Sequence, residues 1–518
     1  MFPRLLLLFV LIVTGHAGAQ SFQKTFGGQF DDVAQSISPV SGGGFIISGY
    51  SESFSGGSFD GYLIKINAAG DTIWTLTTGA LGIDRLYAAT QTTDGGFIAT
   101  GYLQAAGGMH DVLLIKADMS GNVTWKETFG GSYHDEGKDV VQSADGGYVI
   151  TGYTQSTSGG QLDVFLLKTN SIGNLTWGKS FNVPGEQEGY DVDPSSDGGF
   201  IIAGHSKASV NAQKDVFMIK TNSSGNGEWS KTYGTPFHEE GFAVEQTNDG
   251  GFVVAGSTTT SSGNKNTFLV KTNNTGVLAW SFAYGGTGVE EGRSLRECTD
   301  GGFIMSGYTT SFGNMHDLYL VKTNAAGSHE WSKAYGGSNQ DQGYDVVQSA
   351  TGYVAVGSTG SSGAGNFDLY VLKTDGNGNT GCNESQAGTI ITAVACVTSN
   401  MTVSAAAFMP VVATPLLTYG HGGNSATVCT FTGTTEYQSE YDELIIFPNP
   451  ANRKFTVTLT GAIKQAQLKI YNVSGQTIFH LFSDMNTFMV DVSGLPPGMY
   501  FVEVSNKTGN LFSRIAVY

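Results

Sequence analysis

Short hydrophobic runs alternate with turn-forming clusters of Gly, Asn, Asp and Ser over most of the chain. In residues 233–284 the pattern predicts four strands, which are Phe242 to Gln246, Phe252 to Gly256, Phe268 to Lys271 and Trp280 to Tyr284. The turns between them contain Gly, which tolerates the positive φ that tight hairpins require. Four short strands joined by such turns predict one antiparallel, blade-like sheet.

The middle strands of this pattern lack the alternation of a half-buried strand. Runs such as Phe200 to Ala203 and Val164 to Leu167 are apolar throughout, which is typical of strands covered on both faces. A parallel α/β sheet would give similar runs, but it needs intervening helices, and no helical pattern separates the runs. The sequence therefore predicts sheets that are packed between other sheets.

The four-strand pattern recurs with a nearly constant period. Tryptophans recur every 51 or 52 residues, at Trp74, Trp125, Trp177, Trp229, Trp280 and Trp331. Seven lysines recur in step, at Lys65, Lys116, Lys168, Lys220, Lys271, Lys322 and Lys373. Seven Gly–aromatic pairs share this period, beginning at Gly44, Gly96, Gly147, Gly199, Gly251, Gly302 and Gly352. This period with β-type content predicts a β-propeller and not a helical solenoid.

The last repeat lacks its fourth strand, and the start of the chain supplies a matching one. Cys382 stands where the next Trp is expected, whereas residues 21–28 match the segment that begins at Trp229, with Phe22 in the Trp position. A strand donated in this way would close the ring and remove the exposed sheet edges. The predicted fold is all-β: a seven-bladed β-propeller of four-stranded blades over residues 20–381.

The first residues have the features of an export signal. Arg4 precedes the apolar run from Leu5 to Val13, and Ala17 and Ala19 form a small-x-small cleavage site. We predict a signal peptide over residues 1–19, with cleavage after Ala19. The apolar run is too short to span a membrane as a helix, and we expect no transmembrane anchor elsewhere.

The chain changes character after the last repeat. Residues 382–440 are rich in Thr, Ala, Val, Ser and Gly with almost no charge, and we expect a linker or small accessory region there. From residue 441 alternating strands return, including Lys454 to Leu459 and Met499 to Val504. This pattern predicts a small C-terminal β-sandwich over residues 441–518.

The composition of the chain limits the kinds of partner that it can bind and the disulfides that it can form. Charged residues are 14% of the chain, below the usual share of about 25%. The net charge of −18 excludes nucleic acid, whose binding relies on Lys and Arg. The four cysteines, Cys298, Cys382, Cys396 and Cys429, allow three complete pairings. In an exported chain a disulfide is possible, and it would most simply staple the region 382–429.

Acidic residues stand at the start of each repeat, just before its first strand. They are Asp31, Asp32, Asp84, Asp135, Glu136, Glu188, Glu239, Glu240, Glu290, Glu291 and Asp341. If the first strands are innermost, these side chains surround one mouth of the channel and could bind Ca²⁺ or a basic ligand. Alternatively, they cap turns in every blade. His134 and His238 adjoin two of the acidic positions, but they lie in the third and fifth repeats, which argues against a shared metal.

No catalytic motif stands out. Seven equivalent lysines favour a role in building blades over catalysis, with the Asp that precedes the same strand as a possible partner. A nucleophile elbow, a phosphate-binding loop and a zinc-protease motif do not occur in convincing context. Paired carboxylates for glycoside hydrolysis stay open because every blade offers candidates. The sequence therefore favours a protein that is not an enzyme, while an enzymatic role stays open.

Two resemblances refine this reading. Residues 22–381, seen well in Gly137 to Trp177, resemble β-propeller repeats of secreted and surface bacterial proteins. This resemblance implies a fold and no single activity. Residues 444–518, with Phe447-Pro-Asn-Pro-Ala451 and Leu495-Pro-Pro-Gly-Met499, resemble the type A C-terminal sorting domain of the Bacteroidota type IX secretion system. This second resemblance implies Sec export, recognition by the type IX machinery, and release or attachment at the outer cell surface.

Three functions remain open from the sequence. The first is a surface or secreted binding propeller for a glycan, a protein or matrix, which the variation of loops between blades favours. The second is an extracellular hydrolase or lyase that acts on polysaccharide through acids at the channel mouth. The third is a passive structural component of the cell surface. Close similarity among the repeats favours binding or structure, because an active site usually forces one blade to deviate.

Overall fold

The computed structural model describes two compact units, residues 1–433 and 434–518, which are treated separately. The described residues are 21–431 without 56–57, 81, 106, 158–159, 183–184, 208–212, 314, 402–403, 409, 414–417, 421 and 423, and 443–517 without 448–453, 461–465, 473–475, 484–486, 497 and 506–509. The expected signal peptide and its cleavage site lie outside these residues. Every regular element within them is a β-strand.

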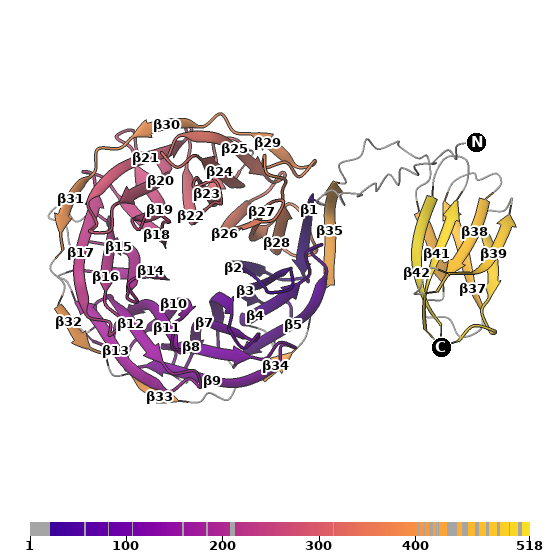
Figure 1. Ribbon diagram of the computed structural model, residues 1–518, viewed down its shortest axis with the longest axis horizontal. Coiled ribbons are helices and arrows are strands. Elements are labelled where there is room, and N and C mark those ends of the chain that lie inside the picture. Colours follow the sequence, from indigo (N-terminus) through magenta and orange to yellow (C-terminus); the bar gives the residue numbers. More distant parts are fainter. Residues whose placement is uncertain are drawn as a thin grey trace, which may run out of the picture. The chain divides into compact units, whose positions relative to one another are not determined.

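The first unit is a ring of seven antiparallel sheets, or blades, around a central channel (Figure 1). The repeat supplies four strands to each blade, which confirms the predicted propeller. The innermost strands are β2 (Asp32–Pro39), β6 (Arg85–Gln91), β10 (Asp135–Gln142), β14 (Gln187–Pro194), β18 (Glu239–Gln246), β22 (Glu290–Glu297) and β26 (Asp341–Ser349).

The next two strands of each blade carry the apolar runs. The second strands are β3 (Phe45–Ser51), β7 (Phe97–Gln104), β11 (Tyr148–Thr154), β15 (Phe200–Ser206), β19 (Phe252–Thr259), β23 (Phe303–Thr309) and β27 (Gly352–Thr359). The third strands are β4 (Asp60–Ile66), β8 (His110–Ala117), β12 (Asp163–Thr169), β16 (Asp215–Thr221), β20 (Lys265–Thr272), β24 (Asp317–Thr323) and β28 (Asp368–Lys373).

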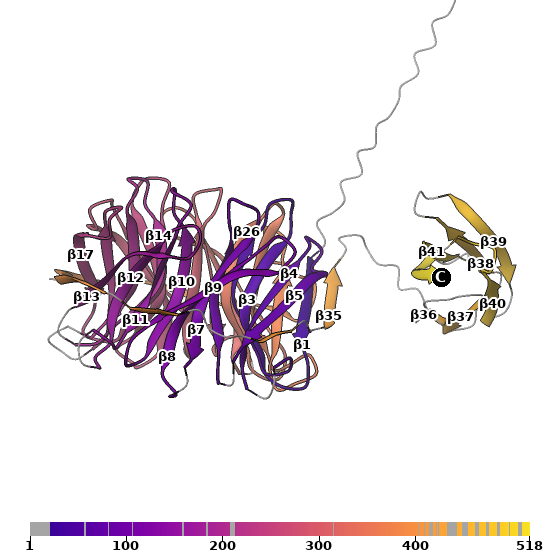
Figure 2. The same cartoon turned by 90° about the horizontal axis from the view of Figure 1, so that it is seen from below.

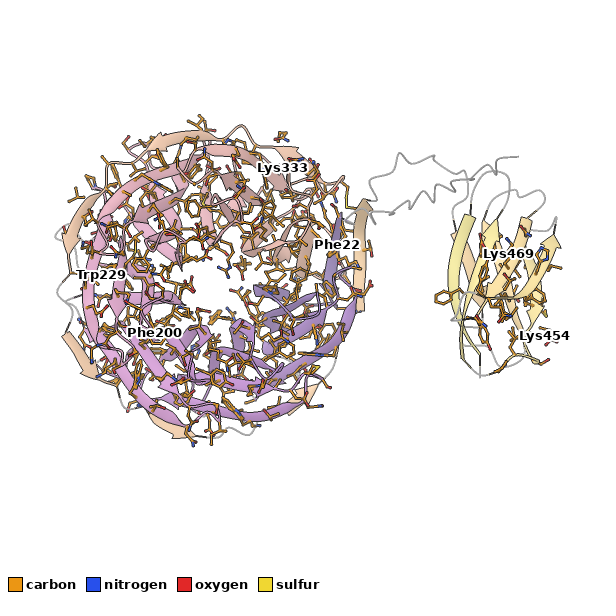
Figure 3. The ribbon with its side chains drawn as sticks, in the orientation of Figure 1. Phe22, Phe200, Trp229, Lys333, Lys454 and Lys469 are labelled. Carbon is orange, nitrogen blue, oxygen red and sulfur yellow. A yellow bond between two sulfur atoms is a disulfide. The ribbon has the colours of Figure 1, made fainter. Side chains whose placement is uncertain are left out.

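The fourth strands carry the recurrent tryptophans, and one of them comes from the start of the described chain. They are β5 (Thr72–Gly79), β9 (Val123–Gly130), β13 (Leu175–Asn182), β17 (Gly227–Gly234), β21 (Leu278–Gly285), β25 (His329–Tyr335) and β1 (Ser21–Gly27). Strand β1 pairs with β28 in the last blade, with Phe22 opposite Lys373. Trp229 faces Lys220 in the same way, and both aromatic side chains lie toward the outside of the ring (Figure 3).

The hydrophobic core lies between blades. One cluster, for example, joins Ile98 and Leu114 of one blade to Tyr148 and Phe165 of the next. Both faces of the middle strands are thus covered, which explains why their sequences are apolar throughout. Side chains such as Ile98 and Phe165 are completely buried, so each blade depends on its neighbours for stability.

Residues after the last repeat add a fifth strand to every blade. These short strands are β29 (Glu384–Gln386), β30 (Ile390–Ala393), β31 (Val397–Asn400), β32 (Ser404–Ala407), β33 (Val411–Ala413), β34 (Thr418–Gly420) and β35 (Asn424–Phe431). Each pairs antiparallel with the fourth strand of one blade. They follow the rim of the ring in order (Figure 1). The segment expected as a linker or accessory region therefore contains the outer edge of the propeller.

The second unit has two antiparallel sheets. One has the order β36 (Glu443–Phe447), β37 (Lys454–Thr460) and β40 (Thr487–Asp491), and the other β39 (Thr477–Ser483), β38 (Ala466–Tyr471), β41 (Gly498–Ser505) and β42 (Asn510–Val517). Phe455, Val457, Ile470 and Val502 from the two sheets share one buried core. In the described parts of both units, no helix is long and apolar enough to cross a membrane.

Candidate binding site in the central channel

Each innermost strand contains a β-bulge at the same place. In β10 the pairing skips from Gly137 to Asp139, so Lys138 is the extra residue. The partner strand has Gly152 here, where an added Cβ would lie 1.9 Å from the carbonyl oxygen of Glu136. The extra residue of a bulge is unpaired, and the bulge changes the direction in which its side chain points relative to a regular strand. The repeated Gly of the second strand is therefore a requirement of this bulge.

The seven extra residues form a ring in the channel wall, which we call the bulge ring. Its members are Gln35, Tyr87, Lys138, Tyr190, Phe242, Arg293 and Tyr344. Neighbouring members contact each other: the Lys138 ammonium lies 3.9 Å from the centroid of Tyr87, and the Arg293 guanidinium 4.6 Å from that of Phe242. Four of the seven are aromatic and two are cationic, so the blades differ from one another where they face the channel.

The channel wall encloses a cavity of about 440 Å³. The bulge ring forms one part of its lining, and a layer of carboxyl and hydroxyl groups forms the next. The second layer includes Asp139, Asp191, Asp193, Glu245, Asp345, Ser36, Ser294 and the cation Arg296. The cavity volume falls within the range of small-molecule sites. The site thus combines aromatic faces with hydrogen-bonding groups.

The carboxyl groups of the second layer tie adjacent innermost strands together. Asp191 accepts the backbone N–H of Val244 at 2.7 Å, and Asp345 accepts that of Ile37 at 2.8 Å across the closure of the ring. Burial raises the pKa of Asp193 to about 7. Burial and the adjacent Asp191 carboxylate raise the pKa of Asp139 well above its usual value, and these two carboxyl groups hydrogen-bond to each other.

The first group of predicted acids is buried away from the channel. Asp32, Asp84, Asp135, Glu239, Glu290 and Asp341 are all completely buried. Asp135, for example, accepts hydrogen bonds from the backbone N–H of Gly131 and the Ser156 hydroxyl, both at 2.8 Å. These side chains hold the loop that enters each innermost strand. Asp31, by contrast, accepts the backbone N–H of Phe367 at 3.2 Å.

The second group of predicted acids lies at the channel mouth but is neutralised by partners. Glu136 contacts His110 and Lys138, both at 2.7 Å. Burial alone would raise the pKa of Glu136, but Lys138 and His110 outweigh it and lower the pKa to about 2. Glu240 similarly contacts Lys214 at 2.6 Å and Lys265 at 2.7 Å.

Glu291 and Glu188 complete this group. Glu291 contacts Lys265 and Arg293. Glu188 accepts the Tyr190 hydroxyl at 2.7 Å and lies 3.6 Å from His205. Lys138 and Arg293 of the bulge ring and the outer lysines Lys214 and Lys265 therefore pair with Glu136, Glu240 and Glu291.

The partners at the mouth follow a rule that sequence reasoning missed. Glu136, Glu240, Glu291 and Gln342 each contact the residue 26 positions earlier, which is His110, Lys214, Lys265 and His316 respectively. Arg85 at the equivalent position stacks on Phe59, 5.2 Å from the ring centroid. The separation of 26 residues is constant among these blades, but the residue types at the two positions vary too much for the sequence alone to reveal the pairing.

The described residues offer no ready metal site. No group of three or more His, Cys, Asp or Glu side chains within them is arranged to hold a metal ion. His134 and His238 each accept a backbone N–H, from His110 at 3.2 Å and from Lys214 at 3.3 Å. These two histidines hold loops in separate blades and are not brought together.

Exposed apolar side chains surround the mouth. Phe30, Ile83, Tyr133 and Phe237 lie in the loops that precede four innermost strands and are large and exposed. Figure 2 shows the ring from the side, with its loops at two opposite faces. Met119, Ile172 and Val277, in the turns between third and fourth strands at the other face, are also exposed, so exposed apolar groups alone do not single out the mouth. The cavity and the bulge ring make the mouth the strongest candidate site.

Comparison with known proteins identifies the second unit. Residues 445–518 match the secretion system C-terminal sorting domain. No curated protein matches the chain. Among solved structures, Sqt1 from Chaetomium thermophilum is 12% identical, with 64% of this chain and 81% of that one covered and a TM-score of 0.40.

Two further structures are similarly distant. PorZ, a surface component of the type IX secretion system of Porphyromonas gingivalis, is 11% identical, with 95% of this chain and 59% of that one covered and a TM-score of 0.38. A fungal alcohol oxidase of the AA5 family in complex with copper is 11% identical, with 97% and 99% covered and a TM-score of 0.39. None of the three indicates what the channel binds. The tail match confirms that the protein is exported by type IX secretion to the cell surface or beyond.

Proposed function

We propose that the propeller is an extracellular binding module that takes sugar units of a glycan into the mouth of its channel. The observation that carries this proposal is the bulge ring. Seven positions that the repeat makes equivalent hold Gln, three Tyr, Lys, Phe and Arg. Positions that build the blades, such as the Gly opposite each bulge, do not vary. Difference among channel-facing positions that the repeat makes equivalent supports selection for a ligand.

The chemistry of the cavity supports a sugar. Aromatic rings offer apolar faces with a polar edge, which suits the C–H face of a pyranose. Tyr190 and Phe242 are adjacent, with ring centroids 5.1 Å apart. Carboxyl, hydroxyl and guanidinium groups below them can hydrogen-bond to hydroxyl groups. The paired charges of the mouth favour a neutral, hydroxyl-rich ligand over a strongly charged one.

Binding is better supported than hydrolysis. Glycosidases hold their two carboxyl groups about 5–10 Å apart, with the substrate or a water between them. Asp139 and Asp191, which are neighbouring carboxyl groups of the cavity wall, instead hydrogen-bond to each other. Each also accepts a backbone N–H of the next blade, from Val192 and Val244. These contacts assign the pair a role in holding blades together.

A glycan array probed with the full-length protein tests this proposal. The ligand that binds best is then titrated calorimetrically against Tyr190→Ala and Phe242→Ala, which we expect to weaken affinity about tenfold or more each. Ile172→Ala, exposed on the opposite face, is the control and should bind like the parent. Absence of any glycan ligand, or unchanged affinity in both aromatic variants, would contradict the proposal. Turnover of the glycan would favour the hydrolase instead.

A further inference from the structure

Residues 382–431 encircle the whole propeller, and we call this segment the belt. Its strands meet the blades in reverse order, from the blade of β25 through those of β21, β17, β13, β9 and β5 to the blade of β1. In Figure 1 the belt strands lie outside all the others around the ring. The belt strands therefore begin on the sixth blade and end on the seventh, which β1 completes, and Cys382 at the head of the belt also lies against β1 of the seventh blade.

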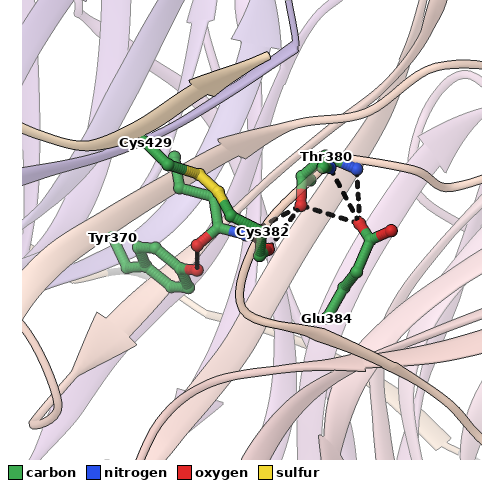
Figure 4. The surroundings of a disulfide bond; sticks show 7 residues. Tyr370, Thr380, Cys382, Glu384 and Cys429 are labelled. Atoms are coloured by element: carbon green, nitrogen blue, oxygen red, sulfur yellow. Dashed lines mark hydrogen bonds between the residues drawn. A yellow bond between two sulfur atoms is a disulfide. The ribbon is translucent and has the colours of Figure 1, made fainter. Parts of the chain in front are cut away.

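A disulfide joins the two ends of the belt. It links Cys382, just before β29, to Cys429 in β35. Figure 4 shows this bond near Tyr370 of the last blade, Thr380 just before the belt and Glu384 in the first belt strand. The remaining cysteines, Cys298 and Cys396, are free. The bond turns the belt into a covalently closed loop with the blades inside it.

Within the described residues, the belt is attached at an equivalent place in several blades. The residue that follows the outer-strand aromatic contacts the belt backbone: Ser281 donates to the Val394 carbonyl at 2.6 Å, and Ser332 to that of Ala387 at 3.1 Å. At Gly178 an added Cβ would lie 2.0 Å from the Phe408 carbonyl oxygen. The outer strands are therefore shaped to receive the belt.

In the last blade this place is occupied by Gln23 of β1. Its amide nitrogen donates to the Cys382 carbonyl at 2.6 Å, and its amide oxygen accepts the Tyr370 hydroxyl at 2.7 Å. Strand β1 is paired with β28 on one edge and β35 on the other. The strand that closes the ring is thus covered by the strand that carries Cys429.

We propose that the belt and its disulfide form a latch that locks the closed ring. All seven belt strands can pair only when all seven fourth strands, including β1, are in place. Once Cys382 and Cys429 are joined, β35 cannot leave β1 without displacing the belt along the ring. The N-terminal strand therefore stays paired on both edges, and the blades cannot separate at the seam between the two ends of the repeat.

Hydrogen exchange distinguishes this latch from an ordinary cross-link. A cross-link that acts only through the entropy of the unfolded chain leaves local opening of the native state unchanged. The latch instead predicts that Cys382→Ser/Cys429→Ser frays from the end of the belt. We expect amides of β35 and β1 to exchange about tenfold faster or more, with a smaller increase at each belt strand back toward β29.

Two measurements keep the test independent of the folding of the variant. The oxidised parent protein is treated with dithiothreitol, which gives two electrons and two protons to the disulfide and becomes a cyclic disulfide, leaving two thiols. It should show the same exchange gradient. Cys396→Ser, a change of a free belt cysteine, is the matched control and should behave like the parent. Unchanged exchange of β1 and β35 after reduction, or an equal effect of Cys396→Ser, would overturn the latch.

Discussion

At the residue scale, each boundary between blades holds a pair of buried polar side chains. Burial, reinforced by the charge of Asp341, raises the pKa of Asp317 to about 6. Burial and Asp84 do the same for Asp60. At the boundary that leads into β22, the pair is Asn266 and Glu290. At this boundary the chain naturally has an amide at the position that Asp317 and Asp60 hold in other blades.

We predict that Asp317→Asn stabilises the propeller at pH 8 and not at pH 4. A carboxyl whose pKa is raised on folding contributes full stability at low pH and loses it as pH rises from about 4 through about 6. Removing the ionised form should raise the free energy of unfolding at pH 8 by about 1–2 kcal/mol, allowing for solvent screening. Guanidinium titrations at both pH values measure this difference.

The reverse exchange is the control for this prediction. Asn266→Asp creates a further acid pair next to Glu290 and should lower the free energy of unfolding at pH 8 by a similar amount, with little effect at pH 4. Equal effects of either substitution at the two pH values would show that ionisation is not the cause.

The partners of the recurrent lysines show what the sequence could not reveal at this scale. The sequence offered the Asp that precedes the same strand as one possible partner of each Lys. Instead Lys168 contacts Asp145 at 2.7 Å, and Lys271 contacts Asp249 at 2.9 Å, both in the neighbouring hairpin turn. Each Lys stands at the end of the third strand, and the pairing of that strand with the second strand places the Lys beside the hairpin turn that carries its Asp partner. The Asp expected as partner lies at the other end of that strand.

At the element scale, strands that repeat were predictable and strands that do not were missed. The fourfold pattern is reinforced seven times, so its strands and turns are visible despite their length. Strands β29 and β33 have three residues each, too short for a periodic pattern to be recognised. Their conformation is imposed by pairing with the outer strands. The bulges were hidden as well, although the repeated Gly-x-Asp of Gly137 and Gly343 marks their place.

We predict that Gln23→Ala destabilises the seam of the ring. Gln23 is completely buried, and its removal leaves the Tyr370 hydroxyl and the Cys382 carbonyl without this partner. Unsatisfied buried polar groups should lower the free energy of unfolding by about 2–4 kcal/mol. Thermal or guanidinium unfolding measures the loss. Gln35→Ala, in the channel wall, should cost less than about 0.5 kcal/mol; an equal loss in both variants would refute a special role for Gln23.

At the scale of the whole molecule, the two units have separate tasks. The fold class and the sorting tail were predictable, because a repeat and a family motif extend over many residues. The candidate site was predictable only in outline. The acids were placed near the channel mouth, but their burial and pairing depend on which way each of two consecutive carboxylates points. The bulge ring depends on the register between the first and second strands of each blade.

We predict that a chain ending at Gly433 keeps the propeller folded but is not delivered outside the cell. The two units form separate compact bodies, so the melting temperature of the ring should not change. Without residues 445–518 the sorting signal is absent. Cell fractionation in a host with a type IX system, with the full-length chain as control, measures delivery. Appearance of the shortened chain at the surface or in the medium would contradict this prediction.

The geometry of the outer strands also bears on how the number of blades can change. Successive contacts fall at Ala387, Val394, Met401 and Phe408, so the segment advances one blade for every seven residues. Duplicating one repeat would leave an eighth blade uncovered and would set the two bonded cysteines too far apart. A second insertion of seven residues would have to arise with it. Gain or loss of a single repeat, which is an easy step for an open array of repeats, is therefore disfavoured. The length of the segment between the two cysteines matches a ring of seven blades and no other number.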